Sequence, residues 1–266
     1  MVSRLKHLKS KSKEIKFLFK NSILIRDIYE NLKYCNANDD ASTIRIEMEK
    51  QDFDVYGLEK DKRIFGYVER LSLKDGSCER YQNTLHPWEL IADSTSLIDV
   101  LPLLRDNPRM FVLERNCISG IVTRGDLQKS PFRMLSFGLI SLVEMNLLKI
   151  IRIYYPADSW KCFLTENRVT KADQLLTERK KRNEAVDLAD CLQFCDKRTI
   201  LLNNPEIIKK LGYENTDELK TLLEKIEGLR DRLAHSQDII AGSSWTEVIE
   251  LIEKLDMLLQ KCEEID

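Results

Sequence analysis

Arginine, aspartate and histidine occur close together in the segment GLRDRLAHSQDII, as Arg230, Asp231 and His235. A histidine can take up or release a proton near neutral pH. A guanidinium can hold two phosphate oxygens through parallel hydrogen bonds and can stabilise charge that develops on phosphorus. The chain has only three histidines, so a histidine that shares a short segment with an arginine is a candidate for function. These residue types in this order predict acid–base chemistry on a phosphodiester.

The apolar pattern around these residues predicts the helix that carries them. On an unbroken helix, Arg230 and His235 would lie ~140° apart around the axis. The pattern stops after Ala234, which predicts that the helix ends there. A helix end would allow the two side chains to share a site, and a second chain could also complete such a site. The alternative is that Arg230 is an ordinary exposed helix residue and His235 a C-terminal cap favoured by the helix dipole. The apolar stripe consists of Leu219, Leu222, Leu223, Ile226, Leu229 and Leu233.

Helical periodicity dominates the chain from Ser130 onward, and strand signals are missing there. Ser244 and Glu247 have the spacing of a capping box, and Asn204-Pro205 reads as a cap followed by a first helical residue. Short connections between long helices predict an antiparallel bundle of four main helices. The helices are expected at about 132–155, 171–202, 205–211, 217–234 and 245–262.

The helical block resembles the HEPN domains over about residues 132–266. Arg230 and His235 match the two defining residues of their R-x4-6-H motif, and Asp231 matches the polar residue that often follows the arginine. The segment DLADCLQFCDKRTIL is similar to their second helix. The resemblance implies an endoribonuclease that works as a homodimer and needs no metal or other cofactor for catalysis. The implied reaction is attack of the RNA 2′-hydroxyl on its adjacent phosphate, which gives a 2′,3′-cyclic phosphate.

Two other functions fit the same resemblance. The helical block could be a non-catalytic binding or regulatory domain. It could also be the toxin half of a pair whose partner is a nucleotidyltransferase that modifies it. The sequence leaves both alternatives open.

A different pattern precedes the helical block. The segment from Trp88 to Leu127 predicts a strand at Trp88–Ile91, a cap at Asp93–Ser96, a helix at Leu97–Arg105, then two strands and a helix in FVLERNCISGIVTRGDL. This is a β-α-β-β-α unit.

The same order recurs earlier, from Asn31 to Leu73. A strand is expected at Leu32–Cys35, an acidic cap at Asp39 and Asp40, and two further strands joined by the turn Glu59-Lys60-Asp61. Gly66 falls where Gly120 falls in the later copy. A duplication of this kind predicts two half-sheets that bury their apolar faces together.

The duplicated segment resembles a pair of CBS motifs, a Bateman module, over about residues 22–130. Its most specific part is GIVTRGDL. The resemblance implies an adenine nucleotide as regulatory ligand, with Thr123 and Asp126 holding phosphate and ribose, and Ile91 and Ala92 lining the base. In the first copy Glu69 and Ser72 take the motif positions, and the glutamate would repel phosphate. The alternative is that Thr123 and Asp126 only cap the following helix.

Composition sets the remaining bounds. The chain has 266 residues, 43% of them apolar, which is enough for two domains, and its net charge of -2 confines any nucleic-acid contact to a patch. Seven cysteines without a C-x-x-C pair predict reduced, mostly buried thiols in a cytoplasmic protein and no zinc site at Cys191 and Cys195. Charged residues interrupt the apolar run from Met134, so we expect a buried helix and no membrane partner. The prediction is an α+β protein with a basic arm (1–21), a CBS-like pair (22–130) and a HEPN-like bundle (131–266).

Overall fold

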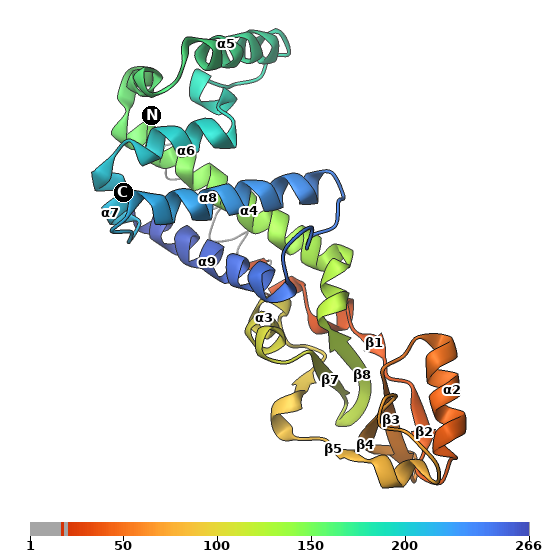
Figure 1. Ribbon diagram of the computed structural model, residues 1–266. Coiled ribbons are helices and arrows are strands. Elements are labelled where there is room, and N and C mark those ends of the chain that lie inside the picture. The colour runs from red at the N-terminus through yellow and green to blue at the C-terminus, as the bar shows by residue number, and fades with distance from the viewer. Residues whose placement is uncertain (1–16, 19–20, 266) are drawn as a thin grey trace. The chain divides into compact units, whose positions relative to one another are not determined.

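The computed structural model describes residues 17–18 and 21–265 (Figure 1). Nearly all of the predicted basic arm therefore lies outside the described residues. The chain divides between Phe132 and Arg133 into two compact units. We call the unit before this point the repeat unit and the unit after it the helical unit. The protein is mixed α/β, with all the named strands in the repeat unit.

The repeat unit contains the predicted order of elements twice. Each copy has a short strand, a helix and a β-hairpin. The first copy consists of β2 (Tyr34–Asn36), α2 (Ala41–Gln51), β3 (Val55–Lys60) and β4 (Arg63–Glu69). The second consists of β6 (Leu90–Ala92), α3 (Leu97–Asp106), β7 (Arg109–Glu114) and β8 (Cys117–Thr123). The helix expected after β8 begins as the 3-10 helix η4 (Arg124–Gln128) and continues as α4 from Ser130.

Two extra strands join the copies. β5 (Asn83–Thr84) precedes the second copy in the sequence but pairs with β4 of the first copy. β1 (Glu30–Asn31) precedes the first copy but pairs with β8 of the second copy. The four-stranded sheets have the orders β2-β3-β4-β5 and β1-β8-β7-β6. The strand that precedes each copy thus completes the sheet of the other copy.

The two hairpins match in detail. Both have a two-residue turn with positive φ at each position, at Asp61-Lys62 and Arg115-Asn116, the turn geometry that fits the twist of paired strands. The turn predicted at residues 59–61 was therefore placed too early, because Glu59 and Lys60 still belong to β3. Both ladders also shift register at the same place, after Leu58 and after Val112.

The equivalence of Gly66 and Gly120 has a steric cause. Each glycine lies where the added edge strand passes the hairpin. A Cβ atom on Gly66 would lie 2.8 Å from the carbonyl oxygen of Asn83, and one on Gly120 would lie 2.2 Å from Cδ2 of Tyr29. Only glycine allows the edge strand to approach this closely, so the pair of glycines marks the reciprocal closure of the two sheets.

The helical unit contains the long helices predicted from periodicity, with one correction. The helix expected over 171–202 is broken into two. The break has Asn183 at positive φ and a 3-10 turn capped by Asp187, whose carboxylate accepts from the backbone of Asp190 at 3.1 Å. The helices are α4 (Ser130–Tyr154), α5 (Glu166–Lys181), α6 (Phe194–Leu202), α7 (Pro205–Lys210), α8 (Thr216–Ala234) and α9 (Trp245–Glu264).

Among the described residues, α4 alone is long and apolar enough to cross a membrane by length and composition. A core helix passes the same test, and 61% of its most apolar stretch is buried. The polar residues that interrupt the run have protein partners: Asn146 donates to the Leu142 carbonyl at 2.9 Å, and the buried Lys149 ammonium donates to the Ile265 carbonyl at 2.7 Å. This packing is that of a core helix.

All seven cysteines are free. Four are buried, namely Cys35, Cys78, Cys191 and Cys262. Burial raises the pKa of the Cys262 thiol to about 12, so it stays protonated at physiological pH. Cys191 ends a 3-10 turn and Cys195 lies in α6, so the two do not lie on one helix.

Replacing Gly120 with alanine should destabilise the repeat unit by about 1–3 kcal/mol, because the added methyl group would force Tyr29 and β1 away from β8. The matched control is Gly228→Ala in α8, where the nearest atom is Arg232 Nη1 at an ordinary 3.5 Å. That change should stabilise the helix by about 0.5–1 kcal/mol. Thermal unfolding measures both. Equal effects of the two substitutions would contradict the close approach.

Candidate functional site

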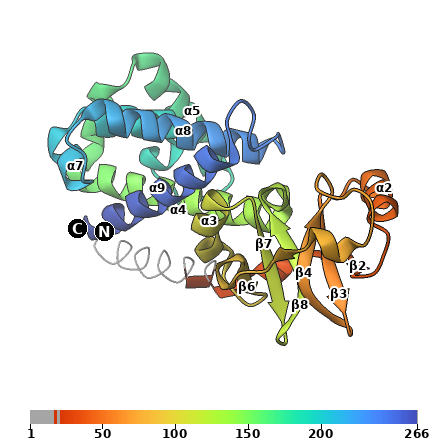
Figure 2. The same cartoon turned by 60° about the horizontal axis from the view of Figure 1, so that its bottom comes forward.

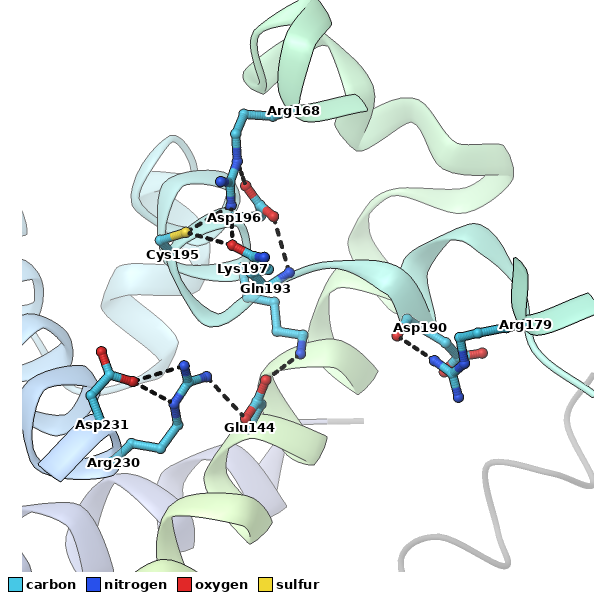
Figure 3. A network of polar contacts seen from close by, with 10 residues as sticks. All are labelled: Glu144, Arg168, Arg179, Asp190, Gln193, Cys195, Asp196, Lys197, Arg230 and Asp231. Carbon is cyan, nitrogen blue, oxygen red and sulfur yellow. Dashed lines mark hydrogen bonds and ion pairs between the residues drawn. The ribbon is translucent and has the colours of Figure 1, made fainter. Parts of the chain in front are cut away.

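The guanidinium of Arg230 is fixed by carboxylates. Arg230 lies in the last turns of α8, and its Nε and Nη2 atoms donate to Oδ1 of Asp231 at 3.2 and 2.9 Å (Figure 3). Its Nη1 atom lies 3.9 Å from Oε2 of Glu144 in α4. The guanidinium carbon lies 5.9 Å from the centre of the Phe194 ring in α6, within the range of a cation–π contact. Arg230 is therefore held against two other helices.

A buried lysine anchors this arrangement. Lys197 of α6 is only 5% exposed, and its ammonium donates to Oε1 of Glu144 at 2.7 Å (Figure 3). A buried charge is costly unless it is paired, so Lys197 holds the Glu144 carboxylate in place. Neither residue was predicted as part of the site. The sequence does single out Glu144, because it is an acid inside the most apolar run of the chain.

His235 occupies the end of the same helix. α8 ends at Ala234, as the apolar pattern predicted, and His235 is its C-cap, with its backbone N–H donating to the Asp231 carbonyl at 3.0 Å. The side chain is exposed, and within the described part of the chain its imidazole has no hydrogen-bond or ion-pair partner. The structure joins Arg230 to Asp231 but makes no contact between either side chain and the imidazole. The convergence of Arg230 and His235 stays a prediction.

The polar network continues along α6. Asp196 is buried, and its Oδ1 accepts from Nε of Arg168 in α5 at 2.6 Å (Figure 3). Nη2 of Arg168 also lies 2.8 Å from the Cys195 sulfur and 3.0 Å from the Gln193 amide oxygen. The hydrogen bond to Asp196 raises the pKa of Arg168 above its ordinary value. Arg168 therefore stays charged near neutral pH, and its contacts with Asp196, Cys195 and Gln193 tie α5 to α6.

Thr123 and Asp126 do lie together. Asp126 is 7% exposed, and its Oδ2 accepts from both the backbone N–H and the hydroxyl of Thr123, at 2.7 and 2.9 Å. Its Oδ1 lies 2.8 Å from the Lys129 ammonium. Burial lowers the pKa of Lys129, but hydrogen bonds to Asp126 and Glu30 outweigh burial and raise it overall. These contacts cap η4, so a ligand that used Asp126 would have to share them.

The two residues predicted to line the base lie elsewhere on the sheet. Ile91 and Ala92 of β6 pair with Val112 and Leu113, whereas Thr123 pairs with Arg109 at the other end of β7. Three residues along a strand cover ~10 Å, and β6 and β8 are two strand spacings apart, which adds roughly 9.5 Å across. Ile91 is buried and Ala92 is exposed. The structure does not bring them into contact with Thr123.

The first copy has an ion pair where the second has its threonine. Glu69 takes the place of Thr123 and pairs with Arg109. The guanidinium carbon of Arg109 lies 5.2 Å from the centre of the Tyr67 ring. The Ser72 hydroxyl donates to the Glu69 carbonyl at 2.7 Å. Arg109 from the second copy thus neutralises the acid that would repel phosphate and occupies its carboxylate.

No three His, Cys, Asp or Glu side chains of the described residues are grouped so that they could hold a metal ion.

Comparisons with known proteins found matches only among solved structures. No protein-family model matches the sequence. No curated protein matches it either. Structures of CBS-domain proteins are among the matches. The matches with the first eight solved structures each cover less than half of this chain.

Three of the matching structures show the low sequence identity of these matches. An uncharacterised conserved protein from Pyrococcus horikoshii is 17% identical, over 40% of this chain and 90% of its own, with a TM-score of 0.36. A hemolysin-like protein containing a CBS domain, from Oenococcus oeni PSU, is 12% identical over 45% and 97%, with a TM-score of 0.36. CBSX2 in complex with AMP is 14% identical over 42% and 98%, with a TM-score of 0.37.

Replacing Glu144 with glutamine should lower the free energy of unfolding by roughly 1–3 kcal/mol, because Lys197 then keeps a buried charge without a carboxylate. The double variant Glu144→Gln/Lys197→Met removes that charge and should recover part of the loss. Chemical denaturation of the single and double variants measures the coupling. Additive losses would show that the two side chains do not interact.

Proposed function

We propose that the helical unit is a metal-independent endoribonuclease and that the repeat unit regulates it by binding an adenine nucleotide. The observation that carries the first part is the end of α8. There the imidazole of His235 is exposed and has no side-chain partner among the described residues, and it follows an arginine fixed by Asp231 and Glu144. An oriented cation and an exposed imidazole near the same helix end support the proposal of chemistry on a phosphate group.

The proposed reaction is intramolecular transesterification of RNA. One His235 removes the proton from the 2′-hydroxyl, whose oxygen forms a bond to the adjacent phosphorus while the bond from phosphorus to the 5′-oxygen breaks. A second His235, from another copy of the chain, donates a proton to the departing 5′-oxygen. The products are a 2′,3′-cyclic phosphate and a 5′-hydroxyl end. DNA lacks the nucleophile and should not react.

Arg230 has donors left for this role. Its Nε and Nη2 atoms are engaged by Asp231, but Nη1 lies 3.9 Å from Glu144, beyond hydrogen-bond distance. The N–H groups on Nη1 can donate to a non-bridging phosphate oxygen. Asp231 and Glu144 then act as positioning residues that keep the guanidinium in one orientation.

The regulatory part of the proposal rests on the duplicated sheet. The two copies share their edge strands and place one complete Thr-x-x-Asp pair, Thr123 and Asp126, beside the Lys129 ammonium. A hydroxyl and an ammonium suit the phosphate of a nucleotide. A nucleotide that binds one arrangement of paired chains better than another would shift the population of the active arrangement.

Binding without cleavage is the second candidate function. The observation in its favour is that two carboxylates already neutralise Arg230, which weakens its attraction for a phosphodiester. In that case the helical unit would recognise a partner through the same exposed helix end and would show no turnover.

Replacing His235 with alanine should reduce RNA cleavage at least about 100-fold, since a positioned general acid–base contributes 10²–10⁴-fold. The assay uses end-labelled RNA with EDTA, and a DNA oligonucleotide of the same sequence as a negative substrate. The matched control is His86→Ala, which removes a histidine stacked on Trp88 in the repeat unit and should leave cleavage unchanged. Wild-type protein that binds RNA without cleaving it would favour the second candidate. Full activity in the His235 variant would refute the assignment.

Replacing Asp126 with alanine should weaken the binding of AMP or ATP by about tenfold, because Thr123 and Lys129 lose the carboxylate that positions them. Isothermal titration calorimetry measures the change. The matched control is Ser72→Ala at the equivalent position of the first copy, which should have little effect. An unchanged affinity in the Asp126 variant, or an equal loss in the Ser72 variant, would count against this ligand site.

A further inference from the structure

A cavity between the tips of the two hairpins has no role in the proposed function. It has a volume of about 1010 Å³ and is lined by the last pairs of both ladders. Figure 2 shows the hairpins β3–β4 and β7–β8 side by side, with their turns at the same edge of the repeat unit. The lining residues from the two hairpins include Glu59, Lys62, Arg63 and Ile64 from the first and Leu113, Arg115, Asn116 and Ile118 from the second.

This cavity is separate from the Thr123 site. In the β7–β8 ladder Arg109 pairs with Thr123 at one end, while Glu114 pairs with Cys117 at the other. The cavity lies at the Cys117 end. The backbone of β7 from Arg109 to Glu114 spans roughly 16 Å. A ligand in the cavity would therefore not contact Thr123 or Asp126.

The charges in the cavity are not balanced by the protein. Lys62, Arg63 and Arg115 line it, and none of the three has an ion pair or side-chain hydrogen bond within the described residues. Glu59 is the one carboxylate of the lining. By contrast, Arg70 and Arg109 in the same unit are each paired with an acid. Like charges that share a hollow repel one another, and an anion would relieve this repulsion.

The two hairpins contribute different groups to the rim. The turn of the first supplies Lys62, and Arg63 follows it, whereas the turn of the second supplies Arg115 and Asn116. The register of each ladder shifts two pairs before the turn, and such an irregularity bends the strands and changes the direction of the residues at the tip. Cations from two separate loops therefore converge on one hollow and could clasp a phosphate from both sides.

The rest of the lining suits an apolar or planar body. Ile64, Leu113 and Ile118 are half-buried and form the floor. Tyr34 lines the same cavity with 57% of its surface exposed, which leaves its ring free to stack. A concave site with an apolar floor and a few convergent polar groups is typical of small-molecule pockets, whereas a polymer needs an elongated basic track.

We propose that this cavity binds a small phosphorylated molecule with at least two negative charges and an apolar or aromatic body. Arg63 and Arg115 hold the phosphates, Lys62 adds charge at the rim, and Tyr34 stacks on the body. The site is a second ligand site of the repeat unit, and its existence does not depend on the ribonuclease proposal or on the Thr123 site.

The test uses calorimetry on the full chain in EDTA at low ionic strength, with two probes. Tripolyphosphate reports the charged part of the site and ATP reports charge and body together. The double variant Arg63→Ala/Arg115→Ala should weaken tripolyphosphate binding at least about tenfold, since each lost contact to a charged group accounts for about that factor. The matched control is Arg45→Ala/Lys50→Ala, which removes the same charge from exposed positions of α2 and should change the affinity less than about twofold.

One further variant separates the parts of the proposal. Tyr34→Ala should weaken ATP binding more than tripolyphosphate binding, because only ATP has a body that can stack on the ring. The proposal is overturned if the wild-type chain binds neither probe, or if both double variants lose binding equally, which would indicate diffuse attraction. It is also overturned if an RNA oligonucleotide binds through Arg63 and Arg115 while both small probes do not.

Discussion

The helical unit is organised around one buried charge. Lys197 cannot be left unpaired in the interior, so α6 must pack where Glu144 of α4 can reach its ammonium. That contact fixes the carboxylate of Glu144, and the carboxylate in turn lies opposite Arg230 of α8. Three helices that are far apart in the sequence are thus brought into a defined register by a single ammonium group. Hydrophobic packing alone would leave this register less specific, because apolar side chains of similar size exchange at small cost.

The repeat unit obeys a different constraint, which is the closure of sheet edges. Each copy of the duplicated segment has an exposed hairpin edge, and an open edge invites pairing with other chains. The strand that precedes each copy covers the hairpin edge of the other copy. Gly66 and Gly120 have no side chain, so these strands can approach the hairpins closely. The same duplication brings two hairpin tips together without making them identical. Both copies line the cavity between these tips, but the rim of the cavity carries different side chains on its two sides.

Much of this architecture could be predicted from local signals. The capping box at Ser244 and the end of α8 before His235 follow from residues within a few positions of one another. The duplication and the equivalence of Gly66 and Gly120 follow from the recurrence of one local pattern along the chain. The failures have local causes too. The turn at Asp61-Lys62 contains no glycine or proline, and the break after Lys181 occurs in a charged run whose composition favours helix. The contacts of Glu144, Lys197 and the hairpin tips could not be predicted, since they join distant segments and leave no periodic trace.

The reciprocal edge strands also impose an order on synthesis of the chain. The first sheet, β2-β3-β4-β5, is encoded by one continuous stretch and can close as soon as Thr84 has left the ribosome. The second sheet needs β1, which emerges before any other strand, and β8, which emerges after all of them. Glu30 and Asn31 therefore have no partner strand until β8 has been synthesised. The two sheets have the same topology, but the strands of the first are complete by Thr84 and those of the second only at Thr123.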